Sequence, residues 1–368
     1  SELYRAHPDW AIATPGRTPT PGRHQLVLDL VRADVRSWLV ETMSAVFASS
    51  KIDYVKWDMN RNISDAYSPA LSPQYSALSP TASQPASLSG AALSPAAPKA
   101  DAPAPDGMSA GNSFPGSQHR QGEFHHRYIL GLYEVMGELV RRFPDILFES
   151  CASGGNRFDL GMLCYMPQIW TSDNTDAHER LAIQQGSSYG YPQSVMGAHV
   201  SASPNMQTLR PSSIESRFNV AAFGLLGYEL DLTMLTPFER KAIQAQIDFY
   251  KRHRKLLQFG RFVRVPTMLH PERTSWAVLS DDGTEAVAGL FQPLVTMDGA
   301  VGTLRVPALS PHTVYSVSGR QQFINVKAFG NLVNHVLPVK IRGDGVIHTV
   351  LSSHYMFRMA DESYRARG

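Results

Sequence analysis

The sequence predicts an α/β protein: a (β/α)8-type barrel that is incomplete at its N-terminal side, followed by a small antiparallel β-sandwich. From residue 32 to about residue 258, short apolar runs alternate with longer stretches of helical periodicity, which is the pattern of βαβ units and a parallel sheet. Each apolar run ends in polar residues, as in barrels whose active sites lie at the carboxyl ends of the strands. From about residue 262, short alternating strands and turn residues replace this pattern.

Five parallel strands are expected near residues 52–58, 146–152, 167–172, 194–199 and 221–227. A complete barrel has eight strands, so about five of the eight are predicted here. Apolar residues at helical spacing predict helices over residues 32–50 and 123–143. Another helix should begin after Thr236, because Thr236-Pro237-Phe238-Glu239 has the form of a capping box with proline at the first helical position.

Composition predicts two domains, a partial barrel over residues 1–260 and an antiparallel domain over residues 261–368. The segment at about 68–118 is rich in Ala, Ser and Pro and repeats the tetrapeptide Ala-Leu-Ser-Pro. Such a composition buries too little apolar surface to offset its ordering entropy, so we expect a disordered insertion. In the second domain, Asp282-Gly283 between two alternating runs predicts a hairpin.

The composition also excludes several classes of protein. The 368 residues carry a formal net charge of +2 and no basic block, which does not favour nucleic acid as a partner. No apolar run approaches the length of a membrane span, so no membrane is expected as a partner. The two cysteines, Cys151 and Cys164, cannot form a disulfide framework. A reducing compartment is the better expectation, and we predict a cytoplasmic protein.

Two strand ends suggest glycosidic bond cleavage. Asp58 and Asp173 each follow an apolar run, next to Trp57 and close to Trp170. On alternate strands of one barrel, the two carboxylates could face each other, one as nucleophile and one as general acid. Lys56 lies on the same side of its strand as Asp58, where a cation favours the ionised nucleophile. The alternative is that each aspartate only forms a turn or caps a helix.

Other residues with catalytic or ligand chemistry have simpler explanations. Cys151 could be a thiol nucleophile, but no histidine follows at a suggestive spacing, so a pocket-lining role is preferred. His119, His125 and His126 could bind a metal, but they fit better as the solvated start of a helix. We therefore expect no metal and no cofactor.

Two further pairs lie at other strand ends. Asp176 and Glu179 are expected to favour the start of the next helix through its dipole, rather than to bind calcium. His199 and Asn205 lie at another strand end, where lining the pocket is one of two open alternatives.

Five ordered motifs resemble glycoside hydrolase family 36, the bacterial-type α-galactosidases. They begin at Lys56, Phe148, Gln168, Tyr191 and Gly227, and read "KWDMNR", "FESCASGGNRFD", "QIWTSDNTDAHERL", "YPQSVMGAHVSASPN" and "GYELDLT". The likeness runs from Ser1 to about Gln258 and continues more faintly beyond. It implies a retaining mechanism, with Asp58 as the nucleophile that forms a covalent galactosyl-enzyme and Asp173 as the general acid/base. It also implies substrate contacts, in sequence order, from Arg23, Lys56, Asn60, Cys151, Gly154 and Trp170.

The resemblance implies a galactoside oligosaccharide of the melibiose or raffinose type as substrate, and is compatible with a homo-oligomer. Ala152 and Asn156 stand where the family has glycine or other small residues. The likeness begins inside the loop after the third barrel strand, so the first three strands and an N-terminal β-sandwich are unmatched. Two alternatives therefore remain: a truncated, inactive fragment of such an enzyme, and a related galactosyl transglycosidase.

Overall fold

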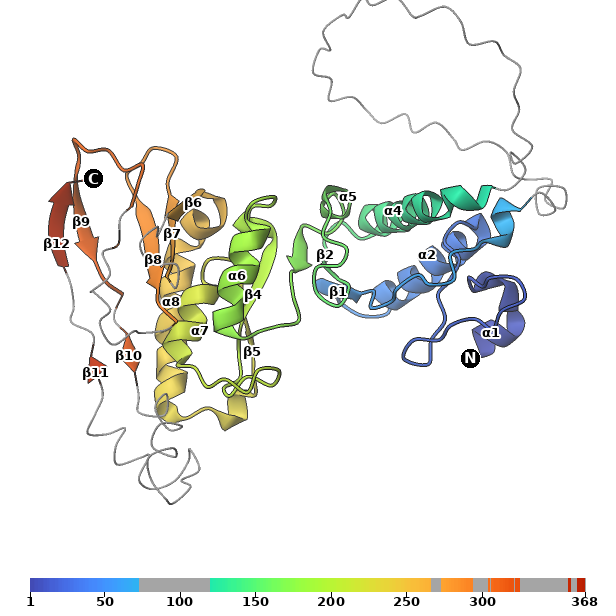
Figure 1. Cartoon of the computed structure of the whole chain (residues 1–368), viewed down its shortest axis with the longest axis horizontal. Coiled ribbons are helices and arrows are strands. Elements are labelled where there is room, and N and C mark those ends of the chain that lie inside the picture. Colours follow the sequence, from blue (N-terminus) through green and yellow to red (C-terminus); the bar gives the residue numbers. More distant parts are fainter. Residues whose placement is uncertain are drawn as a thin grey trace, which may run out of the picture. The chain divides into compact units, whose positions relative to one another are not determined.

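A computed structural model describes residues 1–72, 120–265, 273–293, 304, 306–320, 322–324, 357–358 and 363–367 of the chain (Figure 1). The chain forms two compact groups, which are described separately. The first holds residues 1–52 and 61–146, and the second holds residues 53–60 and 147–368.

The first group is built around two long helices, α2 (Ala33–Ala48) and α4 (Phe124–Arg142), which pack against each other. They match the helices predicted over 32–50 and 123–143. Gly131 of α4 lies so close to the chain before α2 that a Cβ atom would fall 2.1 Å from the Leu30 carbonyl oxygen. Phe47 and Phe143 meet edge to face, with ring centroids 5.5 Å apart. Within the described residues of this group, the short elements are α1 (Glu2–Ala6), η1 (Pro8–Trp10), η2 (Pro69–Leu71) and η3 (Arg120–Glu123).

Ser68 ties three segments of the first group together. Its hydroxyl donates to Asp29 Oδ2 at 2.5 Å, and its backbone exchanges hydrogen bonds with the Gln121 side chain at 2.7 and 3.1 Å. Ser68 also caps η2, so residues 68–72, which composition assigned to the disordered insertion, form a turn with largely buried side chains. The rest of that predicted insertion, from residue 73 on, lies outside the described residues.

The second group contains a five-stranded parallel sheet in which the strand order follows the chain. Each strand pairs with the next one, as expected for consecutive βαβ units. The strands are β1 (Tyr54–Asp58), β2 (Leu147–Cys151), β3 (Gln168–Trp170), β4 (Met196–Ser201) and β5 (Leu225–Glu229). This sheet is the predicted half-barrel.

The prediction for the fifth strand was displaced. Residues 221–227 were expected as the strand, but Ala221 ends helix α7 (Ile214–Ala221), and β5 begins only at Leu225. The sequence Ala221-Ala222-Phe223-Gly224 is fully buried. A short buried apolar run has no polar face, so its periodicity cannot distinguish the end of a helix from the start of a strand.

The two faces of the sheet differ because strand side chains alternate. On one face, Met196, Ala198 and Val200 of β4 are buried, and the last two join the main hydrophobic core. Helices α6 (Ala177–Ser187), α7 and α8 (Pro237–Phe259) supply most of the rest of this core. The opposite face carries the polar and aromatic side chains that form the candidate site.

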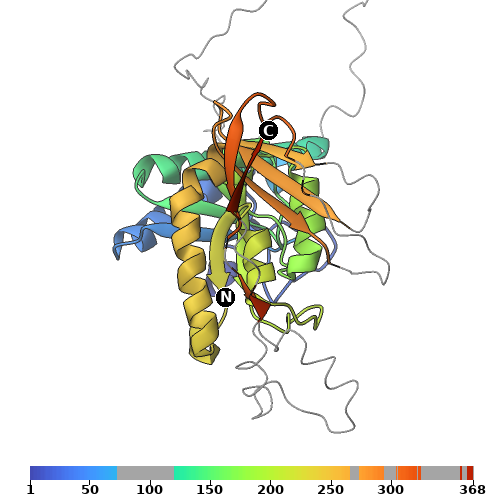
Figure 2. The ribbon, with the colours of Figure 1, turned by 90° about the vertical axis from the view of Figure 1, so that its left-hand side faces the viewer.

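Helix α8 begins as the sequence predicts. Thr236 caps it, its side chain accepting from the Glu239 N–H while the Glu239 carboxylate accepts from the Thr236 N–H, so the capping box is complete. Figure 2 shows this helix in gold over its full length.

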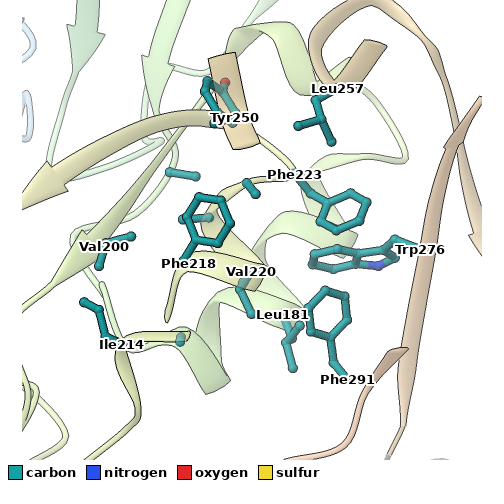
Figure 3. Packing of buried hydrophobic residues seen from close by; sticks show 14 of the residues in the cluster. Leu181, Val200, Ile214, Phe218, Val220, Phe223, Tyr250, Leu257, Trp276 and Phe291 are labelled. Carbon is teal, nitrogen blue, oxygen red and sulfur yellow. The ribbon is translucent and has the colours of Figure 1, made fainter. Parts of the chain in front are cut away.

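The core continues into the strands that follow α8. Trp276 is fully buried between Phe223 and Phe291, with ring centroids 5.5 and 4.9 Å away (Figure 3). It lies on the central strand of an antiparallel sheet of β6 (Arg261–Val265), β7 (Thr274–Leu279) and β8 (Ala286–Phe291). The turn between β7 and β8 contains Asp282-Gly283, with Gly283 at φ +69°, so the predicted hairpin is confirmed.

Two further pairs of short antiparallel strands follow, in agreement with the short strands predicted after about residue 262. One joins β9 (Val314–Ser318) to β12 (Ser363–Arg367), and the other joins β10 (Phe323–Ile324) to β11 (Phe357–Arg358). The remaining short helices of this group are α5 (Leu160–Leu163), η4 (Gln193–Val195) and η5 (Leu232–Met234).

Candidate active site

Two exposed carboxylates lie at the carboxyl ends of strands that flank β2. Asp58 is the last residue of β1, and Asp173 follows β3 by three residues. Parallel strands end at the same edge of a sheet, so both groups belong to the edge at which barrel enzymes carry their catalytic residues. The sheet thus places them on alternate strands, as the sequence predicted.

Asp58 is held by a hydrogen bond from Asn60, which in turn accepts hydrogen bonds from the turn after β2. The Asn60 side-chain amide donates to Asp58 Oδ2. The side-chain oxygen of Asn60, Oδ1, accepts from the Ser153 backbone N–H and, at 3.2 Å, from the Ser153 hydroxyl. Asn60 therefore bridges the Asp58 carboxylate and the β2 turn, which fixes Oδ2 and leaves Oδ1 without a hydrogen bond from Asn60.

Cys151 lies directly beside Asp58, since the two residues are register partners in β1 and β2. Burial, together with the neighbouring Asp58 carboxylate, raises the pKa of the Cys151 thiol to about 11. The thiol is therefore protonated at neutral pH and can donate a hydrogen bond. This environment does not activate Cys151 as a nucleophile, because the thiolate is the reactive form.

Asp173 is oriented by the tryptophan that ends β3. Trp170 Nε1 donates to Asp173 Oδ1 at 3.0 Å, and Trp170 itself is buried. The chain then enters α6 through two local side-chain turns, from Asn174 N–H to Ser172 Oγ and from Asp176 N–H to Asn174 Oδ1, both at 3.1 Å. These bonds fix the short loop that carries Asp173.

Asp176 has the structural role expected from the sequence. It is the N-cap of α6, accepting from the His178 N–H at 3.0 Å, and Glu179 lies in the first turn. Arg210 Nη1 lies 2.5 Å from Asp176 Oδ2. The carboxylate is thus fully used in holding the helix start.

Gly154 allows the β2 turn to approach the Asp173 loop. Its φ is +81°, and a Cβ atom would lie 2.6 Å from Ser172 Cα and 3.1 Å from the Asp173 nitrogen. Any other residue would suffer backbone strain and would collide with backbone rather than with a flexible side chain. The glycine therefore brings the turn that binds Asn60 against the loop that carries Asp173.

A chain of polar and aromatic contacts crosses the same face of the sheet. Lys56 Nζ lies 3.5 Å from Glu149 Oε1 and 4.7 Å from the centroid of the Trp170 ring. Trp170 also packs against His199, with ring centroids 4.4 Å apart and an interplanar angle of 35°, and His199 Nδ1 lies 3.0 Å from Glu229 Oε2. This chain connects all five parallel strands.

The structure brings most of the sequence-predicted site residues into contact with one another. Asp58 contacts Asn60 and Cys151, Lys56 contacts Trp170, and Trp170 and Gly154 contact Asp173 or its loop, as described above. Arg23 is different, because it belongs to the first compact group. It is exposed at φ +51°, in a tight turn closed by reciprocal Gly22 and Gln25 backbone bonds of 2.9 Å. Its contact with substrate stays a prediction.

The two residues left open by the sequence have separate roles. His199 belongs to the contact chain over the sheet. Asn205 is buried, donates to Thr175 Oγ1 at 2.9 Å, and accepts from the backbone of Gln207 and Thr208. Asn205 thus holds the loop after β4.

Sequence reasoning missed Glu149, Tyr54 and Gln168. The Tyr54 hydroxyl and Gln168 Nε2 both donate to Glu149 Oε2, the latter at 3.0 Å. A signal for them was present: Glu149 precedes Cys151 by two residues, and Tyr54 precedes Lys56 by two, so each pair shares a face of its strand. An acidic residue inside an otherwise apolar run requires a partner on that face.

Among the described residues, no group of three or more His, Cys, Asp or Glu side chains could hold a metal ion. Within those same residues, no helix is long and apolar enough to cross a membrane.

Comparison with known proteins agrees with this geometry. The chain is 44% identical over 319 residues to α-galactosidase AgaA of Geobacillus stearothermophilus, covering 87% of this chain and 38% of that protein. It is 42% identical over 308 residues to α-galactosidase 1 of Pediococcus pentosaceus, covering 82% of this chain and 36% of that one. The chain therefore spans a little over a third of the length of these relatives.

Solved structures give the same result. The crystal structure of a variant of the Geobacillus enzyme with 1-deoxygalactonojirimycin matches with a TM-score of 0.71 at 42% identity, covering 86% of this chain and 38% of that one. An α-galactosidase from Lactobacillus brevis matches with a TM-score of 0.71 at 39% identity, covering 97% and 39%. Fold and relatives thus define the class as the glycoside hydrolases built on a (β/α)8 barrel.

The family is equally clear. The Melibiase family profile matches residues 1–82 and 109–260, which is more than half of the chain. The chain belongs to the Melibiase family, the α-galactosidases of glycoside hydrolase family 36.

Proposed function

We propose that this chain is the part of a retaining α-galactosidase that carries the nucleophile, Asp58, and the general acid/base, Asp173. The observation that supports this most directly is the placement of the two carboxylates at the ends of β1 and β3, on either side of β2. Their hydrogen bonds give them different surroundings, with Asn60 on Asp58 and Trp170 on Asp173.

In the first step, Asp58 Oδ1 attacks the anomeric carbon while the bond from that carbon to the glycosidic oxygen breaks. Asp173 gives its proton to the departing oxygen, and a galactosyl ester forms on Asp58. In the second step, the Asp173 carboxylate takes a proton from water, and the water oxygen displaces Asp58 from the anomeric carbon. Two displacements return the sugar with its original configuration and restore the Asp58 carboxylate and the protonated Asp173.

The hydrogen bonds suggest which oxygen of each carboxylate acts. Asn60 holds Asp58 Oδ2, so Oδ1 is the attacking atom. Trp170 holds Asp173 Oδ1, so Oδ2 carries the transferred proton. Cys151, kept as a neutral thiol by burial, can donate a hydrogen bond beside Asp58 without adding negative charge.

For the substrate, we propose terminal α-galactosides of the melibiose and raffinose type. Support comes from relatives: variants of the Geobacillus enzyme have been solved in complex with raffinose and with stachyose, at TM-scores of 0.70. Lys56, Asn60, Cys151, Gly154 and Trp170 would surround the bound galactose. The sixth proposed contact is Arg23.

The proposal is tested by trapping the ester. In a galactosyl fluoride that also carries fluorine at C2, the C2 fluorine slows both steps, while the fluoride leaving group keeps the first step fast relative to the second. The sugar should therefore accumulate on Asp58 and be found there by peptide mass spectrometry. Asp58→Ala should show neither the trapped ester nor release of nitrophenol from a nitrophenyl α-galactoside. A wild-type chain that gains no label, or gains it on another residue, would overturn the assignment for this chain.

The role of Asp173 is tested by comparing two substrates whose leaving groups differ in their need for a proton. Asp173→Ala should slow hydrolysis of raffinose by about 10²–10⁴-fold, because its alkoxide leaving group needs a proton. Hydrolysis of the nitrophenyl substrate should slow much less, because nitrophenolate leaves without a proton. Equal losses on both substrates would contradict the acid/base role.

Transfer of galactose to an added sugar in preference to water would identify a transglycosidase.

A further inference from the structure

Glu149 is a buried acid in the middle of the parallel sheet that the mechanism above does not use. Its side chain is 3% exposed. Glu149 is the central residue of β2 and the register partner of Lys56 on β1 and of Gln168 on β3. A carboxylate is rarely buried to this extent unless other groups compensate its charge. The groups that contact the Glu149 carboxylate therefore indicate the role of this residue.

Among the residues that the structure describes, hydrogen-bond donors contact only one of the two carboxylate oxygens. Oε2 accepts from the Tyr54 hydroxyl and from Gln168 Nε2 at 3.0 Å. Burial and the adjacent Glu149 carboxylate both raise the pKa of Tyr54, so the phenol stays a donor. Oε1 is buried and accepts no hydrogen bond within the described part of the chain. Three strands thus fix the carboxylate through one oxygen and leave the other directed at Lys56 Nζ, 3.5 Å away.

Lys56 is held between this carboxylate and an aromatic ring. Its ammonium lies 4.7 Å from the Trp170 centroid, within the range of a cation–π contact. A lysine side chain has four rotatable bonds and loses considerable entropy when fixed. Two contacts, one ionic and one with the ring, restrict the ammonium to a small volume close to Glu149 and Trp170.

That volume is next to both reacting groups. Lys56 and Asp58 share a face of β1, about 7 Å apart along the strand. The ring beneath the ammonium belongs to Trp170, which donates to Asp173. A sugar bound over Asp58 would therefore meet the Lys56 ammonium.

We propose that Glu149, held by Tyr54 and Gln168, is a positioning residue that fixes the Lys56 ammonium between β1 and the Trp170 ring, where it meets a hydroxyl group of the bound galactoside. The placement of the Lys56 ammonium is argued from the distances to Glu149 and Trp170 alone. Its contact with the galactoside rests on the proposed function.

The first test measures the placement without using activity. The chain is treated briefly with an amine-acetylating reagent, and the labelling rate of Lys56 is compared by peptide mass spectrometry with that of exposed Lys241 in the same sample. Glu149→Gln should raise the Lys56 rate about fivefold or more, the factor produced by losing one modest ionic contact, while Lys241 stays constant. Glu41→Gln, which removes an exposed acid paired with Arg142, is the matched control and should change neither rate.

The second test uses hydrolysis of a nitrophenyl α-galactoside. Glu149→Gln should lower kcat/KM by about tenfold or more, since small misplacements of a positioned group are costly. Lys56→Met should lower it at least as far. The double variant should be no worse than Lys56→Met, because Glu149 acts through Lys56.

The outcomes separate the two proposals. Unchanged Lys56 labelling in a Glu149→Gln chain with native circular dichroism would overturn the positioning role, as would additive losses in the double variant. If Glu149→Gln does not fold, Tyr54→Phe removes one support of Glu149 and should raise Lys56 labelling to a smaller extent. Labelling that responds in a chain without galactosidase activity would support the positioning and count against the proposed function.

Discussion

Cys151 shows how a thiol can lie beside a candidate catalytic carboxylate and have low reactivity. Its side chain is 2% exposed, and its neighbour Asp58 adds negative charge. Both effects disfavour the thiolate, the form that attacks alkylating reagents. The second cysteine, Cys164, is exposed near the end of a short helical turn.

The two thiols should therefore differ sharply in reactivity. At pH 8, iodoacetamide is expected to modify Cys164 and to leave Cys151 largely unmodified in the folded chain, because the pKa of Cys151 is raised to about 11. Peptide mass spectrometry over time would measure both rates. Cys164→Ser should remove the fast phase, and urea should expose Cys151. Equal modification of both thiols in the folded chain would contradict this environment.

At the scale of single elements, the segments around η2 depend on one buried acid. Asp29 is fully buried, with the Ser68 hydroxyl on Oδ2 and the Val31 N–H on Oδ1 at 3.1 Å. Burial outweighs these hydrogen bonds and raises the pKa of Asp29 to about 6. In the unfolded chain the pKa is about 3.9, so the folded state holds the proton more tightly.

The stability of this group should consequently fall as the pH rises. The contribution of Asp29 is complete below about pH 4, decreases up to about pH 6 and is then constant. Asp29→Asn should match the wild type near pH 4 and be more stable at pH 7, by about 2–3 kcal/mol. Thermal unfolding from pH 4 to pH 7 would measure this difference.

Asp282→Asn provides the control, because its effect on stability should change with pH in the opposite direction. Hydrogen bonds from Ser280 and Thr284 lower the pKa of Asp282 to about 2, so its contribution is lost as the pH falls. Asp282→Asn should therefore be relatively most destabilising at neutral pH. An Asp29→Asn variant that is less stable than the wild type at pH 7 would show that its hydrogen bonds outweigh the cost of burial.

The sequence could predict elements with local signals. The α8 capping box, the Asp282-Gly283 hairpin and the ends of α2 and α4 depend on neighbouring residues, and all appear where expected. The start of β5 could not be placed, because buried apolar residues continue from α7 into the strand without a break.

The positions of the candidate site residues in the fold were predictable to the same extent, whereas their roles stay predictions. Asp58 and Asp173 follow recognisable strand ends, and Asp58 alternates with Lys56. The support from Glu149 was not recognised, because it depends on the register between β1, β2 and β3, and register is a property of pairing over long distances in the sequence.

At the scale of the whole molecule, the core of the second group joins the parallel sheet to the antiparallel one. Trp276 of β7 packs with Phe223, and its indole N–H donates to Gln185 Oε1 of α6 at 3.1 Å. Buried residues on both sides of residue 260 belong to this one cluster. The predicted domain boundary at 260/261 stays a prediction, crossed by a shared core.

Removing this side chain should weaken the whole second group. Trp276→Ala is expected to reduce the free energy of unfolding by about 3–5 kcal/mol, through a large cavity and an unpaired Gln185. Urea unfolding followed by circular dichroism would measure the loss. Trp276→Phe keeps most of the ring volume and should cost clearly less. Equal costs for the two variants would mean that packing around the ring is not the main contribution.

The pairing of β1 with β2 has a consequence for how the site assembles. Tyr54 and Glu149 are 95 residues apart in the chain, whereas Glu149 and Gln168 are 19 apart. Closing the longer loop costs about 1.4 kcal/mol more in chain entropy, because this cost grows only with the logarithm of loop length. We therefore expect β1, the strand that ends at Asp58, to pair with β2 later in folding than β2 pairs with β3. Yet doubling the chain that intervenes would add only about 0.6 kcal/mol, so this connection tolerates large changes in length with Asp58 still in place.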